Sequence, residues 1–225
     1  MNVLVLAAHP DDEVLGCGGT IARLAKEGSQ VYIAILGEGV TSRYNKREDA
    51  DKKLIEKLHS QSRKVGRHLA VKDVLQLNFP DNRFDTVPLL DIIKEVEKLI
   101  KELKPAVIYT HHSGDLNIDH QITHRTVLTA ARPVKDCPVT EIYAFEIPSS
   151  TDWAFQQFEP FRPNVFIDIK ETLEKKTQAM QLYESEVQKF PHPRSVEALV
   201  ARARYWGSIA GLEAAEAFQL VRSIR

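Results

Sequence analysis

An apolar segment that ends in a cluster of charged side chains opens this chain. Residues 2–8 read Asn-Val-Leu-Val-Leu-Ala-Ala, and residues 9–13 read His-Pro-Asp-Asp-Glu. The apolar run is typical of a strand that is buried on both faces of a parallel sheet. Ligands of open α/β sheets bind beyond the carboxyl ends of the strands. An imidazole and three carboxylates therefore stand at the position where such folds carry out chemistry.

Three adjacent acidic side chains favour a positive charge among them, because like charges at close range destabilise one another. A divalent cation is the simplest candidate, since such metals accept mixed histidine and carboxylate ligands. The alternative is that Asp11 or Asp12 only caps the following helix, with Glu13 adding a favourable charge in its first turn. The sequence favours the metal site, because a helix cap needs only one of these residues.

Strand and helix patterns alternate along the first half of the chain. Strand patterns lie at residues 2–8, 31–36, 74–77 and 106–110. Helical patterns separate them at residues 14–27, 47–68 and 88–103. This alternation predicts right-handed βαβ units and an α/β fold, with a Rossmann-like, doubly wound, mainly parallel sheet and helices on both faces.

The second half has a less regular pattern. We expect a helix at residues 119–131, strands at 141–147 and 165–169, and helices at 170–188 and 195–222. Two long loops, at residues 37–46 and 148–164, interrupt the pattern. Long loops inside a compact domain are often lids or binding loops, although an aromatic-anchored surface flap is an equal alternative for the second one.

Length and composition fit one globular domain over residues 1–225. The formal net charge of -1 argues against a nucleic-acid partner. No apolar stretch reaches the roughly 18–20 residues that span a bilayer, and no basic segment precedes the first apolar run, so that run is not a signal peptide. Cys17 and Cys137 indicate reduced thiols in a cytoplasmic protein. A homo-oligomer remains open.

The expected strand order brings two polar clusters together. In a doubly wound sheet of the order 3-2-1-4-5, the first and fourth strands are neighbours. Residues 9–13 leave the first strand, and residues 111–120, which read His-His-Ser-Gly-Asp-Leu-Asn-Ile-Asp-His, leave the fourth. Alternation along the strand should point one of His111 and His112 into the crevice and the other away. This convergence strengthens the metal-site hypothesis.

A dinucleotide-binding turn is the competing interpretation of the first motif. Gly16, Gly18 and Gly19 follow the first strand, but the Gly-x-Gly-x-x-Gly fingerprint must begin directly after the strand. Here acidic residues occupy that turn, and a pyrophosphate beside them would be repelled. The glycines more readily permit close packing of the helix behind the acidic turn.

The motifs resemble those of the LmbE-like or PIG-L deacetylase family. The resemblance is carried by residues 9–13, by Gly-Cys-Gly-Gly-Thr-Ile at 16–21 and by Asn-Ile-Asp-His at 117–120. Softer matches are Phe-Pro-Asp-Asn at 79–82 and residues 211–218. The resemblance implies a Rossmann-like fold and a zinc-dependent amidohydrolase. Such enzymes remove acetyl or related acyl groups from N-acylated amino sugars and their conjugates, which makes a small molecule of that class the expected partner.

The family pattern also implies roles for individual residues. It implies one Zn²⁺ ion per chain, held by His9, Asp12 and His120, with Asp11 as general base. Three protein ligands leave an open zinc position for water. Asp11 can accept a proton from that water and later pass it to the leaving amine. The sugar would most simply be of the N-acetylglucosamine type.

One position departs from the family pattern, because many members have histidine where this chain has Asn117. Asparagine donates hydrogen bonds but cannot deliver a proton at neutral pH. We therefore expect Asn117 to orient the substrate carbonyl or donate to the oxyanion, which leaves the general acid open. Asp119 should hydrogen-bond the outer nitrogen of a metal-bound histidine. His124 shares a helix face with His120 and should lie buried behind the metal, although it is also a rival ligand.

Two basic side chains are candidates for contacting the substrate. Arg43 lies in the loop after the second strand, and residues 190–194 read Phe-Pro-His-Pro-Arg, in which two prolines restrict the backbone around His192. The alternatives are a solvated arginine and a simple turn between helices. For the whole chain, a nucleotide-binding Rossmann protein and a non-catalytic metal-binding domain of the same fold remain the competing functions.

Overall fold

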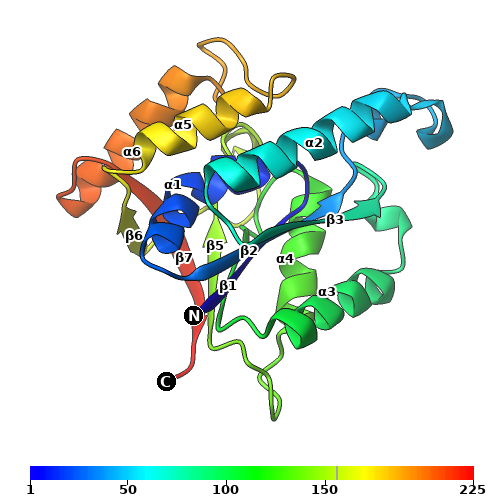
Figure 1. Cartoon of the computed structure of the whole chain (residues 1–225), viewed down its shortest axis with the longest axis horizontal. Coiled ribbons are helices and arrows are strands. Elements are labelled where there is room, and N and C mark those ends of the chain that lie inside the picture. Colours follow the sequence, from blue (N-terminus) through cyan, green and yellow to red (C-terminus); the bar gives the residue numbers. More distant parts are fainter. Residues whose placement is uncertain (156) are drawn as a thin grey trace.

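The computed structural model describes residues 1–155 and 157–225 (Figure 1). Within them a seven-stranded sheet has the order β3-β2-β1-β4-β5-β7-β6. The strands are β1 (Asn2–Ala7), β2 (Gln30–Gly37), β3 (Asp73–Phe79), β4 (Val107–His111), β5 (Glu141–Phe145), β6 (Val165–Asp168) and β7 (Ala215–Ser223). The helices are α1 (Asp12–Lys26), α2 (Lys52–His68), α3 (Leu89–Leu103), α4 (Ile118–Ala130), α5 (Leu173–Leu182) and α6 (Val196–Ala210).

The first five strands are parallel and follow the predicted order. Strand β1 pairs with β2 on one side and β4 on the other, β2 pairs with β3, and β4 pairs with β5. The prediction of a doubly wound, mainly parallel α/β sheet is confirmed. Because β1 and β4 are neighbours, the segments that leave their carboxyl ends start side by side.

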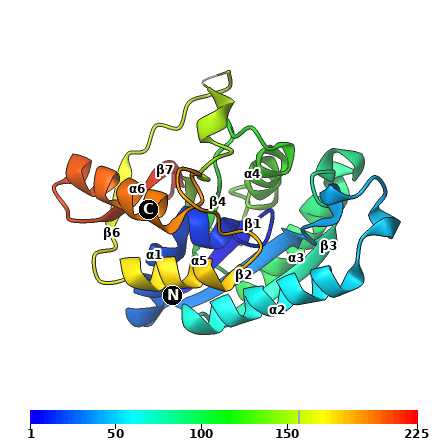
Figure 2. The ribbon, with the colours of Figure 1, turned by 90° about the horizontal axis from the view of Figure 1, so that it is seen from above.

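Alternate residues of the central strands supply two separate hydrophobic cores. Val3 and Val5 pack with α1, α2 and α5 on one face of the sheet. Leu4 and Leu6 pack with α3 and α4 on the other face. All four side chains are fully buried, as expected for a parallel strand covered on both sides. Figure 2 shows these two groups of helices on opposite sides of the sheet.

The prediction of one helix over residues 195–222 is wrong in its second half. Helix α6 ends where Gly211 adopts a left-handed conformation with φ of 71°. Residues 215–223 then form β7, which lies between β5 and β6 and runs antiparallel to both. Phe218 of this strand packs edge-on against Tyr109, with ring centroids 5.1 Å apart. Sheet pairing and this packing override the helix propensity of an Ala- and Glu-rich segment.

Two other predicted helices are shorter than expected. At residues 170–188 only α5 is helical, because Tyr183 leaves the helix, buries its ring and donates a hydrogen bond of 2.6 Å to Glu13. At residues 47–68 the first residues form a separate 3-10 turn, and α2 begins after Asp51, whose carboxylate accepts a backbone N–H and caps the helix.

Close packing behind the charged turn accounts for glycines in α1. A β-carbon on Gly16 would overlap the ring of Phe145, and one on Gly19 would lie 2.9 Å from side-chain atoms of Ile169. Helix α1 therefore lies closer to Phe145 of β5 and to Ile169, which follows β6, than it could with any larger residue at these two positions. This geometry supports the packing interpretation of the glycines over a phosphate-binding turn.

A buried ion pair between Glu216 and Lys176 connects α1 with β7 and α5. Helix α1 is broken at Cys17, where φ is -148° and ψ is 24°. The freed N–H groups of Gly19 and Thr20 donate to the Glu216 carboxylate from β7, at 3.0 and 2.7 Å. Lys176 of α5 pairs with the same carboxylate at 2.6 Å. Because both charges are buried, each depends on the other for its compensation.

None of the described helices combines the length and the apolar character that a membrane crossing requires. Cys17 and Cys137 carry free thiols, the first buried and the second partly exposed. The core packing of the sheet therefore does not depend on a disulfide between them.

We predict that Glu216→Ala lowers the free energy of unfolding by about 3–5 kcal/mol, because it leaves a buried lysine and two helix N–H groups unpaired. Urea unfolding followed by circular dichroism measures this change. The matched control is Glu27→Ala, which removes an exposed partner of Arg23 and should produce a far smaller change. Equal effects of the two substitutions would contradict the role assigned to Glu216.

Candidate metal centre

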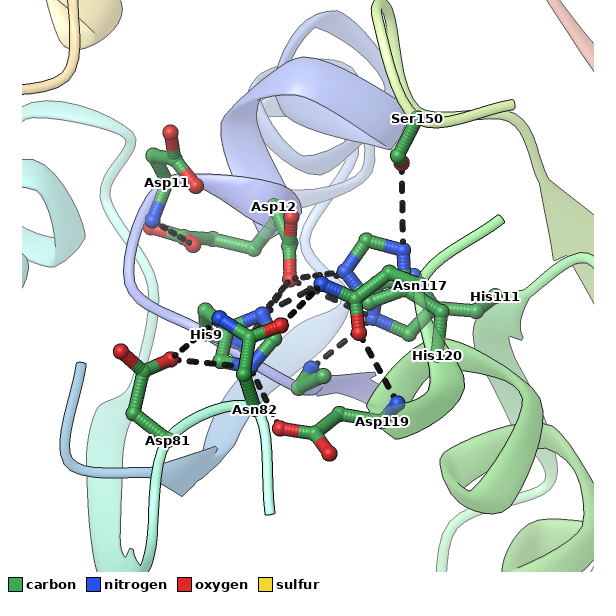
Figure 3. A network of polar contacts seen from close by, with 12 residues as sticks. His9, Asp11, Asp12, Asp81, Asn82, His111, Asn117, Asp119, His120 and Ser150 are labelled. Carbon is green, nitrogen blue, oxygen red and sulfur yellow. Dashed lines mark hydrogen bonds and ion pairs between the residues drawn. The ribbon is translucent and has the colours of Figure 1, made fainter. Parts of the chain in front are cut away.

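The turn between β1 and α1 separates the two adjacent aspartates. Asp11 has a left-handed backbone with φ of 104°, a conformation that costs a non-glycine residue roughly 1–3 kcal/mol. Its N–H donates to the carboxylate of Glu13 at 3.1 Å, which holds the turn. Figure 3 shows Asp12 pointing toward a group of histidines, whereas the carboxylate of Asp11 points away from them. The two neighbouring carboxylates therefore point in different directions, and only that of Asp12 contacts the histidines.

His9, Asp12 and His120 bring three ligand atoms together. Asp12 Oδ2 lies 3.4 Å from His9 Nδ1 and 3.2 Å from His120 Nε2. The two histidine nitrogens are 3.3 Å apart, although their residues are 111 positions apart in the chain. Each residue offers one ligand atom within 4.8 Å of the other two. The neighbouring strands β1 and β4 thus bring the two predicted clusters into one site.

Each histidine of this group has a carboxylate on its outer ring nitrogen. His9 Nε2 lies 2.9 Å from Asp119 Oδ2, and Asp119 Oδ1 accepts the N–H of Phe84 at 2.9 Å. His120 Nδ1 lies 3.1 Å from Asp115 Oδ1. Carboxylate partners of this kind set the ring orientation and tautomer of metal-binding histidines. Asp119 lies where the sequence analysis expected it, whereas Asp115 was not singled out.

Mutual charge perturbs the ionisation of the whole group. Burial lowers the pKa of His120, but the charges of Asp12 and Asp115 raise it to about 9. Burial also lowers the pKa of His9, yet its hydrogen bonds with Asp119 and Asp12 lift that pKa well above its usual value. Burial raises the pKa of Asp12, and the charges of His120 and His111 outweigh this and hold it well below normal. Two protonated imidazoles carry the charge that one divalent cation would bring.

The donor set fits a divalent metal. Asp12 Oδ1 is buried and has no hydrogen-bond partner among the described residues, and a buried oxygen without a partner is costly. Two imidazoles and a carboxylate are also the ligand types of hydrolytic zinc sites. A second possible group consists of His9, Asp81 and Asp119. It would need the His9 nitrogen that is already bonded to Asp119, so the first group is the better candidate.

Three further histidines near this group, His111, His112 and His124, are not among its ligand atoms. His111 stacks on His120 with ring centroids 4.0 Å apart, and burial together with the His120 charge lowers its pKa. His112 turns the other way and lies 2.7 Å from the carbonyl oxygen of Glu159 in the long loop. His124 Nδ1 lies 2.8 Å from the carbonyl oxygen of His111. His124 thus supports the end of β4 and is not part of the candidate ligand group.

A polar cavity of about 210 Å³ opens beside the candidate metal group. Its walls include His9, Asp11, Asp81, Asn82, Asn117 and Arg194. Asn117 Oδ1 accepts the N–H of Asp119 at 2.9 Å and caps α4, while its Nδ2 donates to Asn82 Oδ1 at 2.8 Å. Asn117 is therefore both a helix cap and a lining residue of the cavity.

Arg194 is a site residue that the sequence analysis missed. It belongs to the segment 190–194, in which only His192 was a candidate. Arg194 Nη1 pairs with Asp11 Oδ2 at 2.9 Å, and the side chains are 23% and 2% exposed, respectively. Burial raises the pKa of the Asp11 carboxyl, and the Arg194 charge opposes that rise. The rigid, proline-flanked backbone was the sequence feature that could have drawn attention to this arginine as well.

Arg43 and His192 lie on the same side of the site, at some remove from the candidate ligands. Arg43 lines the cavity, and its guanidinium donates to both oxygens of Glu186, at 2.8 and 3.0 Å. His192 Nδ1 accepts the backbone N–H of Arg194 at 3.1 Å. Its ring meets that of Trp153 edge to face, with centroids 5.6 Å apart, in a hollow that adjoins the cavity.

We predict that His120→Ala loses most of the bound divalent metal, because it removes a ligand, whereas His124→Ala retains it. The two residues lie on the same helix, so they form a matched pair. Elemental analysis of the purified variants gives the metal content per chain. Full retention of metal by His120→Ala would contradict the assignment of His120 as a ligand.

Comparisons with known proteins agree with the motifs. The family model described as PIG-L, GlcNAc-PI de-N-acetylase, matches residues 4–131. An uncharacterised deacetylase of Escherichia coli K12, YaiS, is 33% identical over 175 residues, which cover 76% of this chain and 83% of that protein. The diacetylchitobiose deacetylase of Thermococcus kodakarensis is 25% identical over 236 residues, which cover 99% of this chain and 84% of that protein.

The fold itself extends to proteins of other activity. The crystal structure of GalB, the 4-carboxy-2-hydroxymuconate hydratase of Pseudomonas putida KT2440, matches with a TM-score of 0.79 at 20% identity, over 100% of this chain and 97% of that chain. At this identity the likeness shows the fold alone, since one fold hosts several activities. The family match is more specific, because it includes residues 9–13 and 117–120, and it confirms the predicted class of hydrolytic deacetylase. The chain therefore belongs to the PIG-L, or LmbE-like, family of deacetylases.

Proposed function

We propose that this protein is a zinc-dependent hydrolase that removes the N-acetyl group from an N-acetylglucosamine-type sugar or its conjugate. The observation that carries the proposal is the group of His9, Asp12 and His120 beside a polar cavity that Asp11 also lines. The deacetylase names of the family and of the relatives YaiS and diacetylchitobiose deacetylase support the reaction type. The free cysteines Cys17 and Cys137 support a cytoplasmic location.

His9 Nδ1, a carboxylate oxygen of Asp12 and His120 Nε2 would hold one zinc ion. A zinc ion with three protein ligands would lower the pKa of a bound water molecule and polarise the carbonyl group of an amide. Asp119 and Asp115 orient the two imidazoles through their outer nitrogens. These contacts leave the inner nitrogens directed at the Asp12 carboxylate, as ligands require.

Asp11 is the residue to which we assign proton transfer. The carboxylate of Asp11 is buried at the wall of the cavity. Burial raises its pKa, although the Arg194 charge opposes this rise. The raised pKa is closer to neutral pH, where a general base works best. Arg194 is bonded to Oδ2, so Oδ1 is the atom that accepts the proton of the attacking water. The water oxygen bonds to the acetyl carbon, the carbon–nitrogen bond breaks, and Asp11 returns the proton to the amine nitrogen. The products are acetate and the free amino sugar.

Asn117 is assigned to the carbonyl oxygen of the substrate. Asn117 lines the cavity, and its Nδ2 donates to Asn82 Oδ1, so we propose that a substrate carbonyl can replace that acceptor. An amide donor stabilises the negative charge that develops on this oxygen but delivers no proton. Both proton transfers therefore fall to Asp11.

The cavity suits a hydroxylated substrate. Ser42, Arg43 and Asn82 contribute hydroxyl, guanidinium and amide groups to its walls, and such groups pair with the hydroxyls of a sugar. Arg43 is held by Glu186, so it offers its remaining N–H groups from a defined position. We therefore propose Arg43 as a substrate contact.

A screen for acetate release tests the function. Metal-free protein, prepared with a chelator, should release no acetate from N-acetylglucosamine conjugates, and one equivalent of zinc should restore release. A protein that binds zinc in the His9 group but releases acetate from no N-acetylated sugar would be a metal-binding domain without this activity. Nucleotide binding without acetate release would favour the competing Rossmann function.

We predict that Asp11→Asn keeps its metal and loses roughly 10²–10⁴-fold in turnover, because the amide has nearly the same shape and cannot accept the proton. Asp12→Asn, at the adjacent position, should instead weaken metal binding itself. Turnover and metal content are measured on both variants. Loss of metal in Asp11→Asn, with activity restored by added zinc, would exchange the two roles.

The same assay tests the assignment of Asn117. Asn117→Ala should lower turnover by roughly 10²–10³-fold at unchanged metal content, the usual effect of removing one oxyanion donor. Asn117→Asp keeps the helix cap but replaces the donor by an acceptor, so it should lose activity while remaining as stable as the parent. Normal turnover in Asn117→Ala would reduce the residue to a helix cap.

A further inference from the structure

A second hollow adjoins the cavity that holds the candidate active site. It measures about 310 Å³ and shares three wall residues with that cavity: Arg43, Glu186 and Arg194. Arg194 reaches from the hollow to Asp11, which its guanidinium contacts at 2.9 Å. A ligand seated at Asp11 that extends past Arg194 would therefore enter the hollow.

The lining of the hollow combines one large aromatic ring with polar side chains. Trp153 is 44% exposed, although a ring of this size is usually covered in a folded protein. The remaining residues that line only the hollow are Ser149, Ser185, Gln188 and His192. A lipid chain would leave these polar groups unpaired, whereas a sugar ring offers hydroxyls to them and a face of C–H groups to the indole, whose π face carries partial negative charge.

The charges around the hollow are already balanced. Arg43 is paired with both oxygens of Glu186, and Arg194 is paired with Asp11. Burial and the nearby Arg194 charge lower the pKa of His192, which favours the neutral form of its ring. An anionic group would have to compete with carboxylates that are in place, so the lining favours an uncharged ligand.

The segment that carries Trp153 is held before any ligand binds. The backbone N–H of Trp153 donates to the carbonyl of Ser149 at 2.8 Å, and Arg194 Nε donates to the Ser149 hydroxyl at 3.2 Å. Asp152, next to the tryptophan, is anchored by Arg202 of α6 at 2.6 Å. A segment anchored in this way loses little backbone freedom on binding, which favours affinity.

We propose that this hollow is a subsite for a second, uncharged sugar ring joined to the N-acetylated one, with Trp153 as its stacking platform. The proposal rests on the proposed deacetylase function, because that function places the acetylated ring at Asp11. It narrows the substrate class to a neutral oligosaccharide or glycoside whose neighbouring group is a sugar.

The test compares four acetylated substrates that differ in the group joined to the anomeric carbon of an N-acetylglucosamine ring. These are N-acetylglucosamine, N,N'-diacetylchitobiose, N-acetylglucosamine 1-phosphate and octyl N-acetylglucosaminide. The disaccharide should have a kcat/KM at least tenfold above that of the other three. In Trp153→Ala the ratio of disaccharide to monosaccharide kcat/KM should fall about tenfold, mainly through KM. Phe155→Ala, which removes another exposed aromatic ring of the same loop, is the control and should leave that ratio unchanged.

Two results would overturn the subsite. One is an equal loss on monosaccharide and disaccharide in Trp153→Ala, and the other is a preference for the phosphate or the octyl glycoside. A binding measurement separates this failure from failure of the proposed function. The disaccharide should quench the tryptophan fluorescence of the wild type but not of Trp153→Phe, and this signal needs no turnover. Quenching without acetate release would support the subsite and contradict the deacetylase function. Acetate release without quenching or a preference for the disaccharide would support the deacetylase function and contradict the subsite.

Discussion

The contact of one carboxylate, Asp12, with the imidazoles of His9 and His120 is the interaction on which the site depends. It exists only because β1 and β4 are neighbours in the sheet, so that the residues following each strand start side by side. It also requires the left-handed turn at Asp11, which directs one aspartate at the histidines and its neighbour at the cavity. Glu13 and Tyr183 hold that turn from below through hydrogen bonds of 3.1 and 2.6 Å. The second half of the chain thus supports a motif located in the first thirteen residues.

Much of the first half could be predicted from the sequence, because apolar strand patterns alternate there with helical patterns. The order of the five parallel strands followed from their alternation with helices, and that order predicted that His9 and His120 lie close together. The segment 215–223 was misread, because Ala and Glu favour helix locally and only pairing with β5 and β6 makes the segment a strand. Arg194 and Asp115 escaped notice for a related reason. Arg194 contacts Asp11 and Asp115 contacts His120 only in the folded structure, and no spacing in the sequence indicates either contact.

Several buried carboxylates in this fold are paired with cations, and this pairing helps to explain how so many acids share one site. The charge of Lys176 compensates that of Glu216, which binds α1, and the charge of Arg194 compensates that of Asp11, which precedes α1. Near Asp12 the compensation comes from two histidines, which their own carboxylates hold in the charged form. Only this last group can exchange its protons for a metal, since arginine and lysine offer no ligand atom in their charged forms. The identity of the cationic partner therefore separates the candidate metal site from the other buried ion pairs.

In the proposed mechanism, Asn117 stands where many family members have histidine, so both proton transfers are assigned to Asp11. An enzyme that has a second titratable group can divide the two transfers, whereas under this proposal one carboxylate accepts the proton and releases it again. Its environment then matters more, and the closest charge in that environment is Arg194 at 2.9 Å. The same guanidinium lines the hollow that carries Trp153. In the mechanism proposed here, a sugar bound in that hollow contacts the residue that sets the position and charge of the base, so recognition of the second ring and transfer of the proton depend on one side chain.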